Sequence, residues 1–154
     1  MKKIVMFLLG LVFFVSCGGG RVEPSSGNDD GMQRTYWDNG QLKSEMCYVD
    51  GKLDGPYKTW YDNGQVFQDG QYAEGMMDGS WLIFYPQGQL AARAQYEKGT
   101  GKQTCYNEEG CMIMEVSYVD NLKHGKEIRY ALDGTVLQVV EYEHGKIVPE
   151  NRNP

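Results

Sequence analysis

The amino-acid sequence predicts an all-β fold: an elongated single-layer antiparallel meander of about five β-hairpin repeats, which follows a cleaved helical signal segment. Three observations predict it: the composition, a period of about 24 residues, and turn residues at fixed places in each period. The 154 residues include 20 Gly, 11 Tyr and 3 Trp but only 5 Pro, which is typical of turn-rich β structure with aromatic packing. The length gives room for one domain of ordinary size.

Residues 1–16 have the pattern of an export signal peptide. Lys2 and Lys3 form a short basic start, and residues 4–15 are an apolar run. As a helix this run would extend about 18 Å, well short of the roughly 30 Å hydrocarbon core of a bilayer. We therefore predict a signal peptide and not a membrane-spanning helix. Removal of the two lysines would change the formal net charge from −6 to −8, which repels phosphate backbones, so we expect no nucleic-acid partner.

The segment around Cys17 follows a second pattern. Ser16, a small residue, precedes Cys17, and three Gly follow it. Here the chain resembles bacterial lipoprotein precursors, in which the Cys thiol receives a diacylglycerol, the peptide is cut before the Cys, and the new amino terminus is often acylated. The resemblance implies lipidation at Cys17 and, with Gly18 rather than Asp after it, export to the outer membrane of a cell envelope. Phe14 stands where Leu is usual, and an ordinary secretory signal or an uncleaved anchor is the alternative.

Residues 17–33 are expected to form a flexible tether. They are mostly Gly, Ser, Asp and Asn with almost nothing apolar, so packing cannot offset the entropy lost on ordering. Such a stretch has a mean reach of roughly 20–24 Å. It would lift the following repeat domain, residues 34–147, clear of the lipid head groups. A polar tail, residues 148–154, is expected to blunt the last sheet edge.

A period runs through the predicted domain and determines the fold prediction. Two ladders carry it, a Gly and a Tyr that always lies eight residues after that Gly: Gly40, Gly64, Gly88, Gly110 and Gly134, and Tyr48, Tyr72, Tyr96, Tyr118 and Tyr142. The steps between repeats are 24, 24, 22 and 24 residues. Two further ladders are Trp37, Tyr61, Tyr85, Tyr106 and Tyr130, and Gly51, Gly75, Gly99, Asn121 and Gly145. Asn is the residue next most tolerant of a positive φ after Gly, so Asn121 marks its ladder as a row of turns.

Each repeat is predicted to form a β-hairpin. Asp-Asn-Gly at residues 38–40 and 62–64 indicates type I′ turns. Alternation after such turns predicts strands over residues 42–48, 66–72, 90–96, 112–118 and 136–142, and return strands are predicted at residues 56–61 and 80–85. One hairpin cannot bury its apolar face alone, so neighbouring hairpins should stack. Stacking is expected to bring Tyr48 against Tyr72, and Tyr72 against Tyr96.

Two consecutive segments show the repeat most fully: YVDGKLDGPYKTWYDNGQV at residues 48–66 and YAEGMMDGSWLIFYPQGQL at residues 72–90. They resemble the bacterial variant of the MORN repeat, whose pattern is roughly Tyr-x-x-Gly-x-x-x-Gly-x-aromatic-x-x-Tyr-x-x-Asn-Gly-x-Leu. The resemblance covers about residues 36–146 and implies an elongated antiparallel sheet. The repeat that starts at Tyr96 departs from the pattern, because Gly101 comes early and no aromatic residue precedes Tyr106. We expect a kink or an irregular turn there.

The aromatic residues supply the candidate binding surface. Most of the Tyr ladder is interpreted as packing. A single-layer sheet has two faces, however, and Trp60, Phe67 and Trp81 are expected to be only half covered and therefore available to a ligand. The second face would also carry a polar rim, formed by Lys43, Glu45, Asp69, Arg93 and Glu115.

No group of residues indicates catalysis, a cofactor or a bound metal. His124 and His144 lie at non-equivalent repeat positions and are interpreted as solvated turn residues. The sequence contains neither a G-x-S-x-G nucleophile motif nor a phosphate-binding G-x-x-x-x-G-K-[ST] motif. Asp and Glu occur singly, without the clustered oxygen ligands of a calcium loop.

Three cysteines remain if Cys17 is acylated. Cys105 and Cys111 flank a predicted turn, and an exported compartment permits disulfides, so they are candidates for a disulfide bond. Free thiols at small-residue sites in the sheet are the alternative. Cys47 would then be unpaired.

These features are interpreted as a lipid-anchored repeat scaffold that binds another protein through one face or a terminal edge of its sheet, without catalysis. One alternative is a carbohydrate or cell-wall binding module, in which the aromatic rings stack on sugars. Another follows from the resemblance, because some bacterial proteins with such repeats are labelled antitoxins of toxin–antitoxin pairs. An exported protein would not meet a cytoplasmic toxin, which speaks against that alternative.

Overall fold

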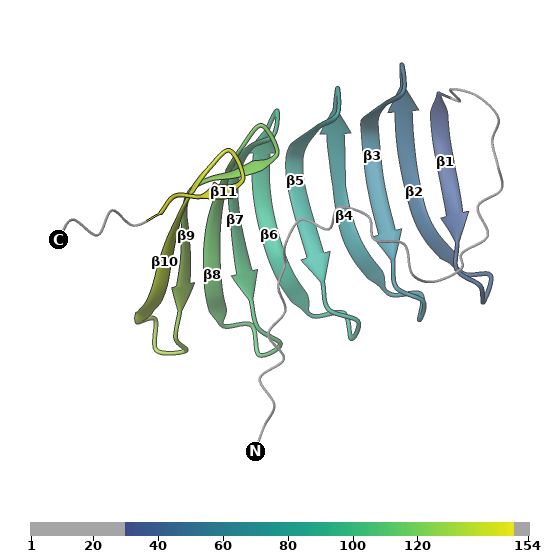
Figure 1. Ribbon diagram of the computed structural model, residues 1–154. Helices are drawn as coiled ribbons and strands as arrows, with labels where there is room; N and C mark the ends of the chain where they lie inside the picture. Colours follow the sequence, from purple (N-terminus) through teal and green to yellow (C-terminus); the bar gives the residue numbers. More distant parts are fainter. Residues whose placement is uncertain (1–29, 150–154) are drawn as a thin grey trace.

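The computed structural model describes residues 30–149, which form one open antiparallel sheet. Its eleven strands lie side by side in chain order, from β1 at one end to β11 at the other (Figure 1). Within the described residues there is no helix, and thus none with the length and apolarity needed to cross a bilayer. The predicted all-β meander is confirmed. The expected signal peptide, Cys17 and the tether up to residue 29 lie outside the described residues.

Each repeat supplies two strands to the sheet. The strands are β1 Gly31–Tyr36, β2 Leu42–Val49, β3 Lys52–Trp60, β4 Val66–Ala73, β5 Met76–Phe84, β6 Leu90–Glu97, β7 Thr100–Tyr106, β8 Met112–Val119, β9 Leu122–Tyr130, β10 Val136–Glu143 and β11 Lys146–Ile147. The five strands that were predicted to follow the Asp-Asn-Gly type of turn each extend one residue further than predicted. Strands β3 and β5 begin four residues earlier than predicted, because the turns before them contain only two residues.

Strand β1 corrects the boundary of the tether. The sequence prediction placed residues 31–33 in the tether, but β1 pairs with β2 from Gly31 opposite Tyr48 to Tyr36 opposite Leu42. Residues 31–36 lack a strong apolar alternation of their own. The unpaired backbone edge of β2 supplies the hydrogen bonds that order them, and the exposed Arg34–Glu45 ion pair (Nε to Oε1, 2.6 Å) adds little.

Two kinds of turn join the strands, and the predicted type is wrong for one of them. The Asp-Asn-Gly segments are not type I′ turns, because only their Gly has a positive φ, +82° at both Gly40 and Gly64. They are type I turns closed by a glycine bulge. Type I′ turns occur instead at the other Gly ladder, where both central residues have positive φ, for example 50° at Asp50 and 71° at Gly51. Asn121 has a φ of 63° and confirms its predicted turn role.

A bulge follows each type I turn and changes which residues face the core. In the pairing of β5 with β6, Ile83 lies opposite Ala92 and Phe84 opposite Leu90, so Ala91 has no partner. Ala91 and Ala92 are nevertheless both buried in the same hydrophobic cluster. Strict alternation of faces therefore fails at the second residue of these strands.

A wider irregularity lies near the opposite end of the hairpins. In β2 and β3, the stretch from Met46 to Tyr48 stands opposite the longer stretch from Leu53 to Tyr57. The same shift recurs between β4 and β5 and between β8 and β9, but β6 and β7 pair without any shift. The expected kink in the short repeat is therefore wrong. The other repeats contain two extra residues that form this irregularity, and the short repeat, which lacks them, has a regularly paired hairpin.

Asn121 joins the turns on either side of the short hairpin. Its side-chain Oδ1 accepts a hydrogen bond from the Met77 amide (2.9 Å), and its Nδ2 donates to the Gly75 carbonyl (3.0 Å). Its own backbone amide donates to the Gly99 carbonyl (3.0 Å), so this one residue links three successive turns through its side chain and its backbone. The sequence prediction for Asn121 contained the turn but not this bridge.

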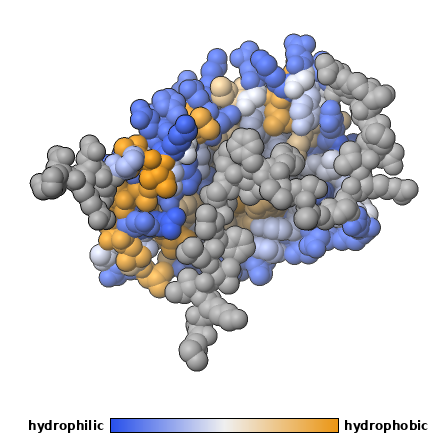
Figure 2. All heavy atoms as spheres, viewed as in Figure 1, coloured by the Kyte–Doolittle hydropathy of each residue, from blue (hydrophilic) through white to orange (hydrophobic). Residues whose placement is uncertain are grey.

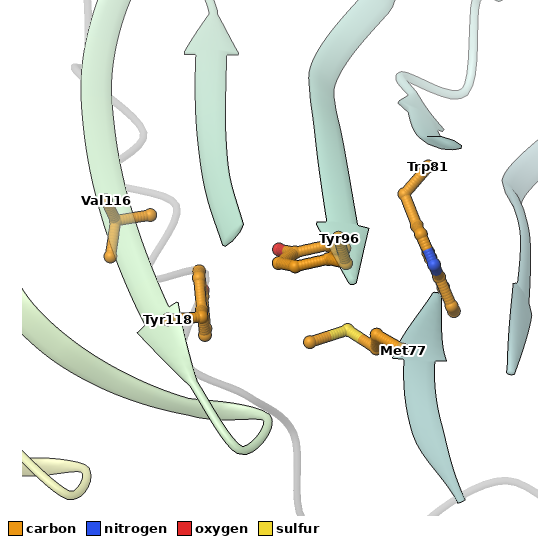
Figure 3. Packing of buried hydrophobic residues seen from close by; sticks show 5 residues of the cluster. All are labelled: Met77, Trp81, Tyr96, Val116 and Tyr118. Carbon is orange, nitrogen blue, oxygen red and sulfur yellow. The ribbon is translucent and has the colours of Figure 1, made fainter. Parts of the chain in front are cut away.

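The core consists of side chains on one face of the sheet. One cluster contains Met77, Trp81, Tyr96, Val116 and Tyr118 (Figure 3). A second cluster contains Ile83, Ala91, Ala92 and Cys105. We call this surface the aromatic face.

The predicted stacking of ladder tyrosines is only partly found. Tyr72 does not meet its equivalents but contacts Tyr57 and Trp81, at centroid distances of 5.3 and 5.1 Å. Equivalent tyrosines are separated by two strand spacings, about 9.6 Å, so rings from the intervening strands fill the space between them. Tyr96 and Tyr118 do pair directly at 5.8 Å, across the short repeat.

The third aromatic ladder divides into two structural positions. Trp37, Tyr61 and Tyr85 follow the ends of β1, β3 and β5, and each donates a side-chain hydrogen bond to a backbone carbonyl of the next repeat. The distances from these side chains to the carbonyls of Trp60, Phe84 and Tyr106 are 3.1, 2.8 and 2.8 Å. Tyr106 and Tyr130 instead end β7 and β9, one position earlier in the repeat. Each of the first three repeats therefore donates a side-chain hydrogen bond from this position to the backbone of the next repeat, and the last two repeats do not.

Candidate binding face

Of the three aromatic residues expected to bind a ligand, Trp81 belongs to the core and Phe67 packs at its border. Trp81 has 5% of its surface exposed, and its Nε1 donates to the Gln71 carbonyl at 3.1 Å. Phe67 lies at the bulge of β4, packs against Tyr61 at 4.8 Å and borders the second core cluster. The expectation that Trp81 is half covered is wrong, because Gly70 beside it has no side chain and leaves room for the whole indole.

Trp60, like Phe67, stays partly accessible. It is half-buried at the end of β3, on the face opposite Thr59, and the Lys58 ammonium lies 6.0 Å from its ring centroid. Tyr36, which ends β1 at the equivalent pairing position, is also exposed, but it was not among the predicted binding residues. The structure therefore brings together no row of exposed aromatic side chains from Trp60, Phe67 and Trp81.

The opposite surface of the sheet, which we call the polar face, carries a shallow groove over β5, β6 and β7. The groove has a volume of about 330 Å³, and six of its eight lining residues form two cross-strand rows of three, with Trp81 and Ala94 between the rows. Strand pairing aligns the six as Ser80, Gln95 and Lys102 in one row and Leu82, Arg93 and Thr104 in the other. The groove lies over the strand pairing that has no bulge, between β6 and β7.

The polar face carries cross-strand ion pairs in the first two repeats, but not at the equivalent position in the groove. At the same pairing position Arg34 meets Glu45 and Lys58 meets Asp69, with ion-pair distances of 2.6 and 2.7 Å. In the next repeat the position holds Arg93, which faces the apolar Leu82.

Arg93 has no carboxylate as an ion-pair partner within residues 30–149. Its guanidinium lies 5.8 Å from the Tyr106 ring centroid, and its side chain is exposed. On the far side of the groove, Lys102 binds Glu115 at 2.8 Å. The hydrogen bond from Lys102, together with one from Tyr130, lowers the pKa of Glu115. Arg93 thus offers a cation that the described chain does not neutralise.

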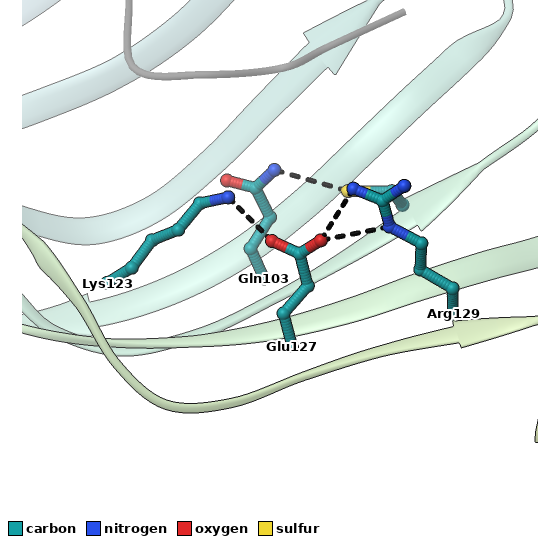
Figure 4. A network of polar contacts seen from close by, with 5 residues as sticks. Gln103, Lys123, Glu127 and Arg129 are labelled. Carbon is teal, nitrogen blue, oxygen red and sulfur yellow. Dashed lines mark hydrogen bonds and ion pairs between the residues drawn. The ribbon is translucent and has the colours of Figure 1, made fainter. Parts of the chain in front are cut away.

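A charged cluster that the sequence analysis missed lies in the aromatic face (Figure 4). Glu127 is fully buried and accepts hydrogen bonds from Lys123 Nζ at 2.6 Å and from Arg129 Nη2 at 2.8 Å. Burial alone would raise the pKa of Glu127, but these hydrogen bonds outweigh it, so the pKa lies below its usual value. The cluster is internally satisfied and acts as part of the core.

A signal for this cluster was present in the sequence. Counting two residues from the second Gly of each repeat gives Tyr57, Trp81, Gln103 and Glu127. The last two are polar residues at a position that the other repeats fill with a ring. Gln103 is also buried, and its Nε2 donates to the Cys105 sulfur at 3.2 Å.

The described cysteines are free thiols. Cys105 faces the second core cluster and is buried, which raises the pKa of its thiol. Cys111 is exposed beside the type I turn, and Cys105 lies opposite Met114 in the register. The disulfide considered between Cys105 and Cys111 is therefore absent from this structure, because Cys111 lies at the turn opposite Asn107, whereas Cys105 lies further along the hairpin.

The two histidines come together, which their spacing did not predict. His124 lies in β9 and His144 in the turn after β10, and their rings are 5.1 Å apart. The His144 amide donates to His124 Nδ1 at 3.5 Å. No group of three or more His, Cys, Asp or Glu side chains with metal-binding geometry occurs among residues 30–149.

Exposed apolar side chains gather at the end of the sheet that holds β10 and β11 (Figure 2). They are Leu132, Val136, Leu137, Val139, Ile147 and Val148. The opposite end carries the exposed side chains of Met32 and Tyr36 on β1. Both ends of the sheet thus combine an open backbone edge with apolar surface.

Comparison with protein families finds a match to part of the chain. The family model described as MORN repeat variant matches three consecutive segments, residues 29–50, 53–74 and 77–98. A search of the curated proteins gave no match to the chain. The three matched segments are the repeats in which Trp37, Tyr61 and Tyr85 bind the next repeat.

Proposed function

Because the chain carries three consecutive MORN repeat variants, we propose that it is a repeat scaffold held at the cell envelope by a lipid on Cys17, and that it binds another protein through the groove of the polar face. The proposal assigns it no catalytic role. The observation that carries it is Arg93, an exposed cation in a shallow groove, at a position where the neighbouring repeats form ion pairs.

The groove has the properties of a protein contact surface. Its floor is a regularly paired sheet, so its side chains keep a fixed spacing. Leu82 supplies an exposed apolar side chain, Ser80 and Gln95 bind each other at 2.8 Å, and Arg93 remains to pair with a partner's carboxylate. Aromatic, apolar and Arg side chains inside a polar rim are typical of protein interfaces.

Site-specific photo-crosslinking in native membranes tests the binding surface. A photoreactive residue at Thr104 is expected to capture one protein, and the additional substitution Arg93→Glu is expected to reduce that adduct at least tenfold, because a like charge then faces the partner's acidic group. A photoreactive residue at Val49, which is exposed on β2 three strands away from the groove, serves as the matched control. Equal capture from Thr104 and Val49, or an adduct unchanged by Arg93→Glu, would contradict the proposed surface.

Lipid attachment is tested at Cys17. The Cys17→Ser variant is expected to leave the membrane fraction or to remain unprocessed, because serine cannot form the thioether to a diacylglycerol and the acyl chains supply the membrane affinity. Cell fractionation together with electrophoretic mobility measures both effects, with Cys111→Ser as the control. A Cys17→Ser variant that is processed and fully retained at the membrane would show that another feature anchors the protein.

The carbohydrate-binding alternative is less well supported than protein binding. It depends on sugar stacking against exposed rings, whereas Trp81 is buried in the core and Phe67 is partly covered by its packing against Tyr61. The antitoxin alternative finds no support in a chain whose proposed location is outside the cytoplasm.

A further inference from the structure

The strands at the two ends of the sheet, β11 and β1, correspond to different parts of a complete repeat strand such as β3. β11 starts like β3: Lys146 and Ile147 lie opposite Glu143 and Tyr142, as Lys52 and Leu53 lie opposite Val49 and Tyr48. After β11 the Val148 amide still donates to the Glu141 carbonyl at 2.9 Å. Pro149, which has no amide hydrogen, follows. β11 and Val148 thus correspond to the first three residues of β3 and stop there.

β1 corresponds to the remainder of β3. Gly31 lies opposite Tyr48 as Gly55 lies opposite Tyr72, and the two pairings then continue in step to the ends of both strands. In this alignment residues 31–36 match residues 55–60. β1 therefore begins at the repeat position directly after the one where β11 and Val148 end.

We propose that β1 of a second copy of this chain completes the strand begun by β11, and pairs with the outer edge of β10. The sheet then continues from copy to copy with the register that β2 and β3 have inside one chain. By that register Thr35 of the second copy lies opposite Gln138, as Thr59 lies opposite Ser44. Arg34 of the second copy lies opposite Val139, as Lys58 lies opposite Glu45.

Exposed surface at both ends supports a second copy as the occupant. On β10, 67% of Leu137 and 48% of Val139 are exposed. On β1, 47% of Met32 and 43% of Tyr36 are exposed. The joined sheet would place these side chains beside new strands, and it would pair the two backbone edges that have no strand partner among residues 30–149. No other stretch of the described chain is available to cover them.

The contact is heterologous, because one copy contributes β10 and the other contributes β1. Such a contact does not close on itself after two copies unless its rotation closes a ring, and it generates open chains of copies otherwise. The proposal goes beyond the proposed function, since it concerns the sheet ends and depends neither on the lipid nor on the groove of the polar face.

Two edge variants test the contact. Glu141 directs its carbonyl to the outer edge of β10, and alternate residues of a strand point to the same side, so Val139 does the same. On β1 the Trp37 amide points to β2, so the amide of Arg34 points outward. Val139→Pro and Arg34→Pro each remove one outward donor and leave the internal strand pairing intact.

Sedimentation velocity of the full chain in a non-ionic detergent separates the outcomes. The unmodified chain is expected to form multiple-copy complexes that grow with concentration, whereas each proline variant alone sediments as a single copy. An equal mixture of the two variants is expected to form two-copy complexes and nothing larger, because it retains one intact β10 edge and one intact β1 edge. A single-copy unmodified chain, or a two-copy complex of either variant alone, would overturn the proposal.

A disulfide trap covers the case in which a proline variant fails to fold. Thr35→Cys and Gln138→Cys, each in a Cys111→Ser background, leave the backbone donors in place. Opposite residues of this pair type lie about 4.5 Å apart at Cα, within the range that a disulfide spans. A cross-linked dimer is expected in the mixture of the two chains and not in either alone. Its absence from a mixture that still associates, or its formation by one chain alone, would refute this register.

Discussion

Trp81→Ala is expected to lower the free energy of unfolding by about 3–5 kcal/mol. Trp81 packs against Tyr57 and Tyr72, with centroid distances of 5.4 and 5.1 Å, and fills the space beside Gly70, where a Cβ would come within 2.4 Å of its ring. Because only 5% of the Trp81 surface is exposed, the variant loses nearly all of this buried contact. Urea-induced unfolding, followed by far-UV circular dichroism, measures the destabilisation.

Trp60→Ala is the matched control for this prediction. It removes the same side chain from the polar face, where Trp60 is only half-buried, and it should cost about 1 kcal/mol. A similar loss of stability in both variants would show that Trp81 holds no special place in the core. A loss larger for Trp60 than for Trp81 would contradict the assignment of the two faces.

Glu127→Gln is expected to lower the free energy of unfolding by about 3 kcal/mol near neutral pH. The substitution keeps the size of the side chain but removes its charge, so Lys123 and Arg129 lose the ion that both of them bind. The side chain of Lys123 is only 18% exposed, so water compensates its ammonium poorly. Denaturant unfolding at pH 7 measures the change, and the exposed Glu97→Gln is the control, with an expected change near zero.

The effect of Glu127 should depend on pH in a defined direction. Its pKa in the folded protein lies below the value of about 4.3 expected for an unfolded chain. The carboxylate therefore stabilises the fold fully above the unfolded pKa, and this contribution is lost as the pH falls through the folded pKa. The stability difference between the unmodified protein and Glu127→Gln should shrink below about pH 4. A difference that stayed constant to lower pH would mean that the variant acts through packing and not through charge.

Much of the fold follows from local rules that the sequence displays. Most residues disfavour a positive φ, so the repeated Gly positions, one of them replaced by Asn121, indicated the turns. The alternation of apolar and polar residues indicated the strands between them. The bulges were not visible in this way, because a bulge depends on how two strands align and not on either strand alone. The predicted alternation therefore fails at Ala91, which is buried. The turns at residues 38–40 and 62–64 were assigned the wrong type, because Asp-Asn-Gly suits a type I turn with a glycine bulge as well as a type I′ turn.

The candidate site was less predictable than the fold. Trp81 was expected on an accessible surface, since its ring lies on a sheet with two faces and the sequence does not reveal that the neighbouring Gly70 makes space for it. Arg93 was included only as part of a polar rim. Arg93 is a cation at a position where the two preceding repeats have Glu45 and Asp69. This difference becomes clear when equivalent repeat positions are compared. The same comparison identifies Glu127 among aromatic equivalents.

The open meander has a consequence for the dimensions of the molecule. Each strand pairs only with the strands on either side of it, and the first and last strands do not meet. Gain or loss of one repeat would therefore change the width of the sheet by two strand spacings, about 9.6 Å, and leave the remaining hairpins as they are. The number of repeats thus sets the distance between the two ends of the sheet in whole steps.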